Sequence, residues 1–237
     1  MSFLILVRHG QSVWNLDGKF TGWVDVNLTE QGKLEAEKAG VLIKMRNIHI
    51  NHFYSSLQSR ANDTLKIIKK VLDNEDNFIK AWQLNERHYG ALTGLNKVEM
   101  GKKIGEEKVF EFRRSWDVKP DPLAKESPYH PTNIKTYKGL PKEIVPDTES
   151  LKDTFERVLK YFKDEIQKKL IKENILISAH GNSIRALCKY LFKLDNEQIT
   201  KLEIPTGNPL IIELNDKYEI KKCEYLDKDR AKNLIVF

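Results

Sequence analysis

The chain has 237 residues, 40% of them hydrophobic and 31% charged, which is typical of a soluble globular protein. We therefore expect a single domain over residues 1–237, with no membrane partner, because no apolar stretch is long enough for a bilayer helix. The apolar run at 3–7 is too short for a secretory signal, which predicts a cytoplasmic protein. The net charge of +6 is scattered in short lysine clusters without an RNA or DNA motif, so no nucleic-acid partner is expected.

Hydrophobic patterning predicts strands that alternate with helices along the chain. Strands are expected at 3–7, 52–55, 81–84, 175–178 and 209–214, with an edge strand at 218–225 after a turn at 215–217. Apolar residues three and four apart predict a helix around 61–72, and a second one capped by Thr148 and ending near Ile171. The order predicts an α/β fold: a mostly parallel central sheet flanked by helices on both faces.

Between residues 101 and 147 the pattern is irregular. Six prolines fall between Pro120 and Pro146, and proline excludes long regular elements. Long structureless segments in compact domains are often functional. We interpret this segment as a proline-rich insertion folded over the active site.

Two predicted strands end in the same dipeptide, with His9-Gly10 after the first and His180-Gly181 after the fourth. Ligands of open α/β sheets collect beyond the carboxyl ends of the strands, so the two imidazoles could share one site. A single His-Gly would more simply close its strand, but two copies beside Arg8 indicate a nucleophile that faces an anion such as phosphate. Asn182 or Ser183 is expected to begin a helix whose N-terminus faces that phosphate.

The cysteines and the remaining histidines give no metal pattern. Cys188 and Cys223 lack CxxC spacing and are expected to be buried free thiols rather than disulfide partners. His49 and His52 have no carboxylate or cysteine placed to complete a metal site. We therefore expect no metal.

Several longer motifs resemble one family. They are LVRHGQSVWN at 6–15, FTGW at 20–23, LNERHYGAL at 84–92, GLNK at 94–97, AHGNS at 179–183 and IPTG at 204–207. In this order the motifs resemble the 2,3-bisphosphoglycerate-dependent phosphoglycerate mutases of the histidine phosphatase superfamily. The resemblance spans almost the whole chain.

The resemblance implies that 3-phosphoglycerate and 2-phosphoglycerate are interconverted in glycolysis and gluconeogenesis, with 2,3-bisphosphoglycerate as primer and without a metal. It makes His9 the nucleophile, Glu86 the acid and base, and Arg8, Arg60 and His180 the groups that stabilise the phosphoryl in transfer. It assigns the substrate carboxylate and distal phosphate to Tyr89, Lys97, Arg113 and Arg114. The other implied substrate-binding residues are Gln11, Ser12, Asn15, Thr21, Gly22, Arg87, Gly181 and Asn182. A homodimer or homotetramer is also implied.

Two departures from the family pattern affect expectations. Gln11 replaces a glutamate found in many members, a neutral change that we expect to be tolerated. The tail after Leu226 is shorter than the usual extension over the site, so the phosphoenzyme is expected to leak to water unless residues 234–237 pack back as a seal.

Two other functions fit the same scaffold. A phosphatase would pass the phosphoryl group to water, and the arginine pair at 113 and 114 argues against it. A basic protein that only binds anions or nucleic acid is disfavoured because both histidines and Glu86 are present.

Overall fold

The fold is built on a six-stranded sheet with strand order β3-β2-β4-β1-β5-β6. The computed structural model describes residues 1–232 and residue 234. The strands are β1 (Ser2–Arg8), β2 (His52–Ser55), β3 (Ile79–Lys80), β4 (Ile175–Ala179), β5 (Leu210–Leu214) and β6 (Ile220–Tyr225). Strands β1 to β4 run parallel, and only β5 and β6 are antiparallel to their neighbours. The prediction of a mostly parallel sheet is confirmed.

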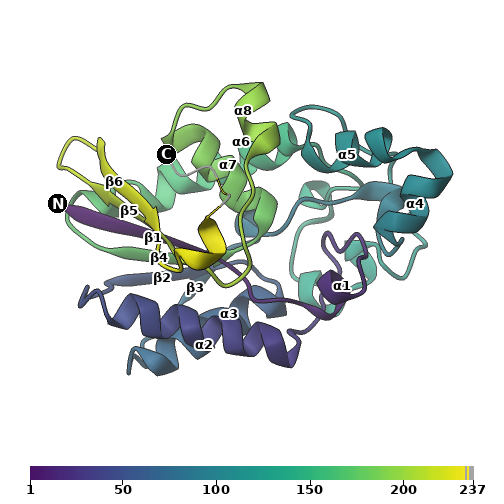
Figure 1. Cartoon of the computed structure of the whole chain (residues 1–237). Coiled ribbons are helices and arrows are strands. Elements are labelled where there is room, and N and C mark those ends of the chain that lie inside the picture. Colours follow the sequence, from purple (N-terminus) through teal and green to yellow (C-terminus); the bar gives the residue numbers. More distant parts are fainter. Residues whose placement is uncertain (233, 235–237) are drawn as a thin grey trace.

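Helices cover both faces of this sheet, as predicted (Figure 1). The helices are α1 (Val13–Leu16), α2 (Glu30–Lys44), α3 (Ser59–Val71), α4 (Lys97–Ile104), α5 (Glu106–Arg114), α6 (Leu151–Tyr161), α7 (Gly181–Leu191) and α8 (Asn196–Lys201). Helices α2 and α3 lie on one face, whereas α6 and α7 lie on the other. Helices α1, α4 and α5 lie beyond the end of the sheet at which β1 and β4 terminate (Figure 1).

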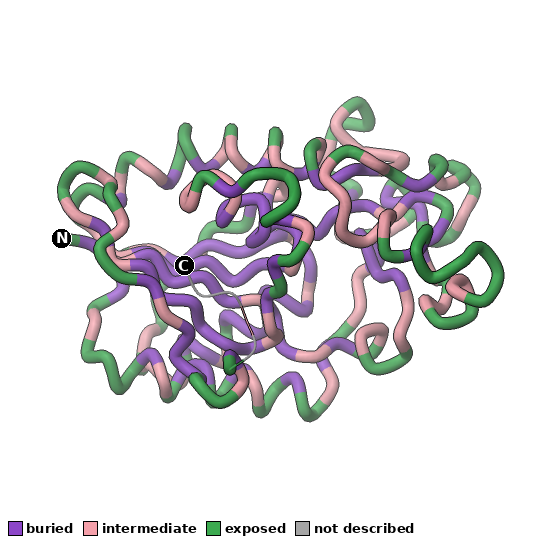
Figure 2. The backbone as a smooth tube through the Cα atoms, turned by 45° about the horizontal axis from the view of Figure 1, so that its top comes forward, coloured by how far each residue is buried: buried purple, intermediate pink, exposed green. Residues whose placement is uncertain are grey.

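The central strand β1 is buried on both faces, which explains its uninterrupted apolar sequence. Because side chains alternate along a strand, Leu4 and Leu6 join the core under α6 and α7, while Ile5 and Val7 join the core under α2 and α3. Figure 2 shows the buried strands running through the interior, with exposed backbone confined to the outer helices and loops. Such a strand is held firmly, and its carboxyl end is a rigid platform for a site.

The expected strand at 81–84 is wrong, because β3 ends at Lys80 and residues 82–84 form a 3₁₀ turn. Ala81 still donates its N–H to the Ser55 carbonyl at 2.9 Å. The next carbonyls are taken by a side chain: Arg157 donates to the carbonyls of Gln83 and Asn85 at 2.6 and 3.0 Å. A guanidinium that binds these carbonyls replaces the strand pairing the sequence pattern predicted.

The second predicted helix begins two residues later and ends earlier than expected. Ser150, not Thr148, is the N-cap of α6 and forms a capping box with Asp153. The Thr148 hydroxyl donates instead to the Pro120 carbonyl at 2.7 Å. The α-helix ends at Tyr161, and the chain continues to Ile171 through a π segment (Phe162–Ile166) and a 3₁₀ turn (Lys169–Ile171).

The prediction of a segment without long regular elements after residue 101 is wrong in its first part. Helices α4 and α5 occupy residues 97–114, which lie before the first proline of the cluster at Pro120. From there to residue 147 the chain is irregular apart from 3₁₀ turns at Pro131–Asn133, Lys135–Tyr137 and Lys142–Ile144. That this segment is an insertion over the site stays a prediction.

The remaining local predictions mostly hold within the described residues. Cys188 and Cys223 are buried free thiols. The hairpin of β5 and β6 forms as expected, although β6 begins at Ile220 because Tyr218 has a positive φ in the turn. None of the described helices is long and apolar enough to cross a lipid bilayer. Leu234 packs against the main core, while the expectation for residues 235–237 lies outside the described residues.

The loop after His9 packs tightly against the first turn of α2. A Cβ on Gly10 would lie 2.0 Å from the Gly32 carbonyl oxygen, and a Cβ on Gly32 would lie 2.1 Å from the Gln11 carbonyl oxygen. Neither residue can carry a side chain unless the loop moves away from the helix. This contact therefore fixes the backbone that follows the candidate nucleophile.

We predict that Gly32→Ala destabilises the protein by about 1–3 kcal/mol, because overpacking a close contact forces the backbone to shift. Gly139→Ala is the matched control, since its Cβ would meet nothing within 4 Å. Chemical denaturation of the two variants gives the measurement. Equal unfolding midpoints for both variants and the unmodified chain would contradict the packing argument.

Candidate active site

Parallel pairing of β1 with β4 brings the two strand-end histidines together. Arg8 lies opposite Ala179 in the register, and the His9 N–H donates to the Ala179 carbonyl at 3.0 Å. The next residue of each strand is a histidine, and the two ring centroids are 5.0 Å apart. Both rings are buried. The repeated His-Gly dipeptide led us to infer that the two imidazoles could meet, and this geometry agrees with that inference.

The protonation of His9 follows from its neighbours. Nδ1 lies 2.7 Å from the Gly10 carbonyl oxygen, which can only accept, so Nδ1 carries the proton. Nε2 then has the free lone pair, and it accepts from Arg60 Nε at 3.3 Å. Burial lowers the His9 pKa well below 6.5, and the charges of Arg60 and Arg8 lower it further. His9 is thus a neutral imidazole with Nε2 available as a nucleophile.

His180 is held from the opposite side. Its Nε2 is 2.8 Å from the Ser56 hydroxyl, which also accepts from the Gln58 N–H at 3.1 Å. Nδ1 of His180 is buried and has no hydrogen-bond partner among the described residues. Burial, followed by the charge of Arg60, lowers the His180 pKa well below 6.5. One imidazole nitrogen is therefore left to interact with a bound group.

Two guanidinium groups flank the histidines: Arg60 is buried, and Arg8 is partly buried. Arg60, at the start of α3, donates to the carbonyls of Val24 and Gly22, both at 2.9 Å. Arg8 donates through Nη1 to the Ile204 carbonyl at 2.7 Å, while its buried Nε has no partner among the described residues. Burial lowers the pKa of both groups, which reflects the cost of holding two cations away from water. A bound dianion would offset that cost.

Glu86 is the carboxylate nearest to this group and is held through its backbone and its side chain. Its N–H donates to the Gln58 side-chain oxygen at 2.9 Å, and Gln58 in turn donates to the Gly22 carbonyl. Oε1 of Glu86 accepts from the N–H groups of Arg87 and Asn182 at 2.8 and 3.1 Å. Helix α7 begins at Gly181, not at Asn182 or Ser183 as expected, and its first turn gives the Asn182 N–H to Glu86.

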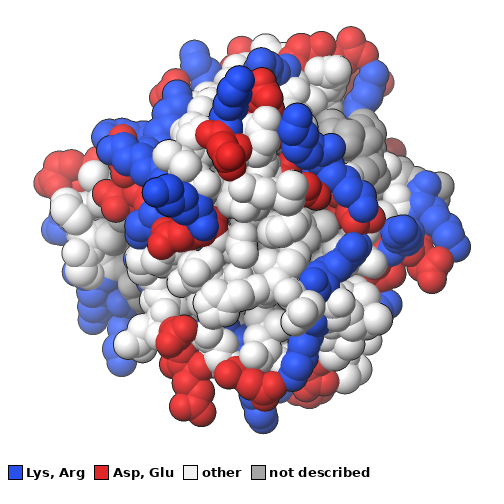
Figure 3. All heavy atoms as spheres, turned by 90° about the vertical axis from the view of Figure 1, so that its left-hand side faces the viewer, with Lys and Arg blue, Asp and Glu red and all other residues white. Residues whose placement is uncertain are grey.

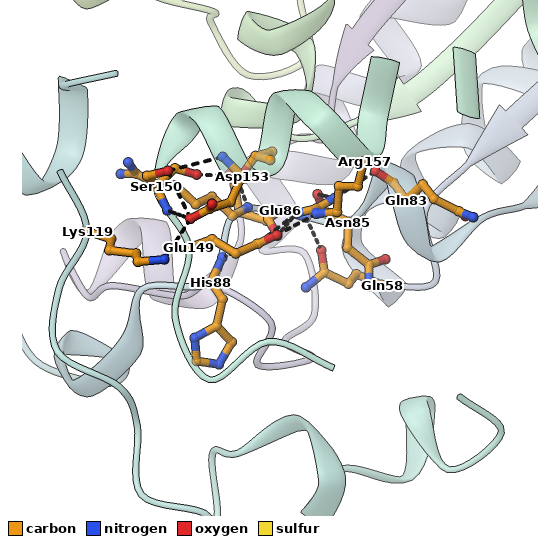
Figure 4. A network of polar contacts seen from close by, with 12 residues as sticks. Gln58, Gln83, Asn85, Glu86, His88, Lys119, Glu149, Ser150, Asp153 and Arg157 are labelled. Atoms are coloured by element: carbon orange, nitrogen blue, oxygen red, sulfur yellow. Dashed lines mark hydrogen bonds and ion pairs between the residues drawn. The ribbon is translucent and has the colours of Figure 1, made fainter. Parts of the chain in front are cut away.

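A buried ion pair fixes the turn that carries Glu86. Arg157 makes a two-pronged contact with Glu149 at 2.6 and 2.9 Å, and it also donates to the Glu86 carbonyl at 3.0 Å. Glu149 accepts from the His88 N–H at 2.8 Å. Figure 4 shows Arg157 and Glu149 beside the chain from Gln83 to His88, with Gln58 reaching Glu86 from another element. Helix α6 thus holds the Glu86 turn in place.

A second group of cations lies farther from the histidines, where α4, α5 and α7 approach one another. Asn182 donates to the Tyr89 hydroxyl at 3.1 Å, and Arg185 donates to the Asn182 oxygen at 2.9 Å. Lys97 donates to the Lys19 carbonyl at 2.7 Å. Burial and the neighbouring Arg114 lower the Arg185 pKa to about 9, which indicates a strongly electropositive pocket.

One pocket collects most of the predicted site residues. Those that line it are Arg8, His9, Asn15, Thr21, Gly22, Arg60, Glu86, Tyr89, Lys97, Arg113, Arg114, Gly181 and Asn182. Lys19, Arg185, Glu203 and Ile204 also line it and were missed in the sequence. Arg185 could have been found, because it lies one helical turn after Asn182. The positions of Lys19 and Glu203 depend on loops that fold against distant helices, so no local signal marks them.

Four predicted site residues lie outside that lining: His180, which is predicted to be catalytic, and three predicted substrate-binding residues. The Gln11 side chain accepts from the Thr29 hydroxyl, and Ser12 caps α1. Arg87 is buried behind the pocket, donates to the Arg113 carbonyl at 3.1 Å and stacks on Tyr89. Its geometry is suited to positioning Arg113 and Tyr89 rather than to touching a ligand.

Elsewhere, cations and anions alternate on the surface. Exposed lysines pair with carboxylates one helical turn away, as in Lys33 with Glu30 and Lys160 with Asp164. On the face drawn in Figure 3, basic and acidic side chains are intermingled. Among the described residues no group of three or more His, Cys, Asp and Glu side chains could hold a metal ion. Within the described part of the chain, the pocket gathers six lysines and arginines together with Arg185 and two carboxylates, an excess of positive charge.

A family model described as the histidine phosphatase superfamily (branch 1) matches residues 4–223. A 2,3-bisphosphoglycerate-dependent phosphoglycerate mutase of Pelagibacter ubique is 67% identical over the full length of both chains. The chain belongs to the 2,3-bisphosphoglycerate-dependent phosphoglycerate mutases. A member of the same family from Borreliella afzelii is 49% identical over 97% of this chain and 94% of its own.

Solved structures share the overall fold of this chain. A structure titled mycobacterial hydrolase 1 has a TM-score of 0.69 at 19% identity and covers 94% of this chain and 96% of its own. A mycobacterial glucosyl-3-phosphoglycerate phosphatase solved with VO₃ also has a TM-score of 0.69, at 20% identity over 95% and 97% of the two chains. At these identities the likeness concerns the fold alone.

We predict that the His9 imidazole stays neutral, with its proton on Nδ1, as the pH falls through 6.5. A folded-state pKa below that of the unfolded chain means that the unfolded state binds more protons, so His9 lowers stability as the pH falls below about 6.5. Nitrogen-15 NMR titration of the imidazoles is the measurement, with His9→Asn used to assign the signal. Titration of His9 near 6.5 would contradict the electrostatic argument.

Proposed function

We propose that the protein interconverts 3-phosphoglycerate and 2-phosphoglycerate through a phosphohistidine at His9. The observation that carries this proposal is the joint presence, in one pocket, of a neutral histidine nucleophile and of a second cation group apart from it. The full-length relative with 67% identity, a mutase by name, supports the same activity. This mutase activity would make the protein an enzyme of glycolysis and gluconeogenesis.

Two unpartnered buried groups suit a phosphorylated ligand. Arg8 Nε and His180 Nδ1 are both buried without partners among the described residues and lie beside His9. Each can donate to an equatorial oxygen of a phosphoryl group, where negative charge spreads during transfer. 2,3-Bisphosphoglycerate, when bound, supplies the phosphoryl group that primes His9.

The transfer step follows from the positions of His9 and Glu86. The Nε2 lone pair forms an N–P bond as the bond from phosphorus to the glycerate oxygen breaks. Arg60, which donates to Nε2 in the structure, gives up that bond and can donate to an oxygen of the phosphoryl group instead. Glu86 donates the proton that the released oxygen takes up. When His9 passes the phosphoryl group on, the oxygen of the other glycerate hydroxyl attacks the phosphohistidine and Glu86 accepts the proton of that hydroxyl. One carboxyl therefore serves both isomers.

The distal cations would hold the part of the ligand that does not react. Tyr89, Lys97, Arg113 and Arg114 face the same pocket as His9, and guanidinium forks suit both carboxylate and phosphate. Each phosphate carries roughly −1.5 to −2 charges near neutral pH. A ligand with two phosphates and a carboxylate therefore needs both cation groups.

We also infer that the protein is cytoplasmic and forms a homodimer or homotetramer. Light scattering during gel filtration tests the oligomeric state.

His9→Asn tests the phosphohistidine. We expect the unmodified chain to gain an acid-labile phosphoryl group from 2,3-bisphosphoglycerate, visible by intact-mass analysis. The variant should take up no label and lose at least about 10³-fold in kcat, because the covalent route is removed. A label that survives acid, or one that persists in His9→Asn, would contradict the assignment. Circular dichroism establishes that the variant is folded.

Arg113→Ala tests the distal group. Loss of one charge-assisted hydrogen bond should raise KM for 3-phosphoglycerate about tenfold or more. Inhibition by phenyl phosphate, which has no carboxylate, should change little. Arg46→Ala is the control, since Arg46 pairs with Glu224 outside the pocket lining. Equal losses for both ligands would count against a distal role.

A further inference from the structure

A carboxylate lies at the mouth of the cation-rich pocket. Glu203 lies between α8 and β5 and lines the pocket, and its carboxylate forms an ion pair with Arg114. The Glu203 side chain is 58% exposed, whereas that of Arg114 is 17% exposed. Glu203 therefore faces solvent on one side and a candidate ligand-binding guanidinium on the other.

Arg114 is directed toward Glu203 by its other contacts. Its Nη1 donates to the Leu202 carbonyl at 3.3 Å, and its own carbonyl accepts from Arg185 at 3.1 Å. An anion that binds Arg114 must compete with the Glu203 carboxylate for the same guanidinium. The family resemblance assigns Arg114 a role in binding the ligand, but it assigns no role to Glu203.

The same segment reaches the cations beside the nucleophile. The Ile204 carbonyl accepts from Arg8, and the charge of Glu203 is one of those that raise the Arg8 pKa, in opposition to burial, which lowers it. Glu203 is thus close enough to both cation groups for its charge to act on either. Glu86 and Glu203 are the two acidic residues that line this pocket.

We propose that Glu203 is a specificity-determining residue that weakens binding of the bisphosphorylated ligand more than binding of the monophosphorylated substrate. Its negative charge repels a ligand in proportion to that ligand's own charge, and two phosphates roughly double the repulsion of one. The carboxylate also occupies Arg114, which the distal phosphate needs. The consequence is readier release of 2,3-bisphosphoglycerate between turnovers and a greater need for added primer. This inference rests on the proposed mutase function.

A different role for Glu203 predicts the opposite effect. If its ion pair mainly held Arg114 in a productive position, neutralising Glu203 would weaken the binding of both ligands. Glu203→Gln separates the two roles, because glutamine has the same shape and can still accept a hydrogen bond but carries no charge. Glu197→Gln is a control with the same change in net charge, since Glu197 lies on α8 and pairs with Lys201 at the surface.

The test compares two quantities in each variant: the half-saturating concentration of 2,3-bisphosphoglycerate and KM for 3-phosphoglycerate. In Glu203→Gln we expect the first to fall about three- to tenfold and the second to fall less, with a smaller effect at high salt. Glu197→Gln should change neither. Calorimetric titration of 2,3-bisphosphoglycerate into His9→Asn, with and without Glu203→Gln, should give the same tightening without turnover.

The outcomes distinguish this inference from the proposed function. If the unmodified chain has no mutase activity with 2,3-bisphosphoglycerate, the proposed function fails. If the unmodified chain is active but Glu203→Gln leaves bisphosphate binding unchanged or weaker, or shifts both ligands equally, the role given to Glu203 is overturned. The same holds if Glu197→Gln reproduces the effect.

Discussion

The pairing of β1 with β4 is the constraint on which the site depends. Two segments more than 160 residues apart in the sequence are held side by side by a parallel ladder, and the His9 N–H extends that ladder by one more bond to Ala179. Because both strands are buried on both faces, a slip of the register would expose apolar side chains or bury polar ones. The distance between the two imidazoles is therefore set by the core of the protein.

Buried positive charge is the second constraint. Arg8 and Arg60 are placed where burial disfavours their charged form, and burial of His9 together with their charges lowers the His9 pKa and keeps that imidazole neutral. The arrangement costs stability, as preorganised active sites generally do, since an uncompensated buried cation is unfavourable. A phosphoryl group restores the balance of charge. The positive charge that lowers the stability of the folded protein also favours the binding of anions in this pocket.

Backbone carbonyls and buried side chains complete this preorganisation. Gln58 joins Gly22 to Glu86, and Arg157 binds three carbonyls of the turn before His88. Neither residue lines the pocket, yet both determine where Glu86 lies. Glu86, which lines the pocket from a loop, is in this way tied to helices α3 and α6, which are themselves packed on the sheet.

Much of the sheet and a chemical hypothesis for the site could be predicted from the sequence. Uninterrupted apolar runs predicted the buried parallel strands, and the repeated His-Gly dipeptide with Arg8 pointed to a phosphate-binding nucleophile. The expected strand at 81–84 was wrong because the side chain of Arg157, distant in sequence, binds the backbone carbonyls of Gln83 and Asn85. The expected irregular segment was wrong in its first part because α5 lies before the first proline of the cluster. Three features could be seen only in the folded chain: Gln58 holds Glu86, Arg87 lies behind the pocket, and Glu203 pairs with Arg114. Periodicity and propensity act between near neighbours, whereas these contacts join residues 26 to 89 positions apart and form only when the helices pack on the sheet.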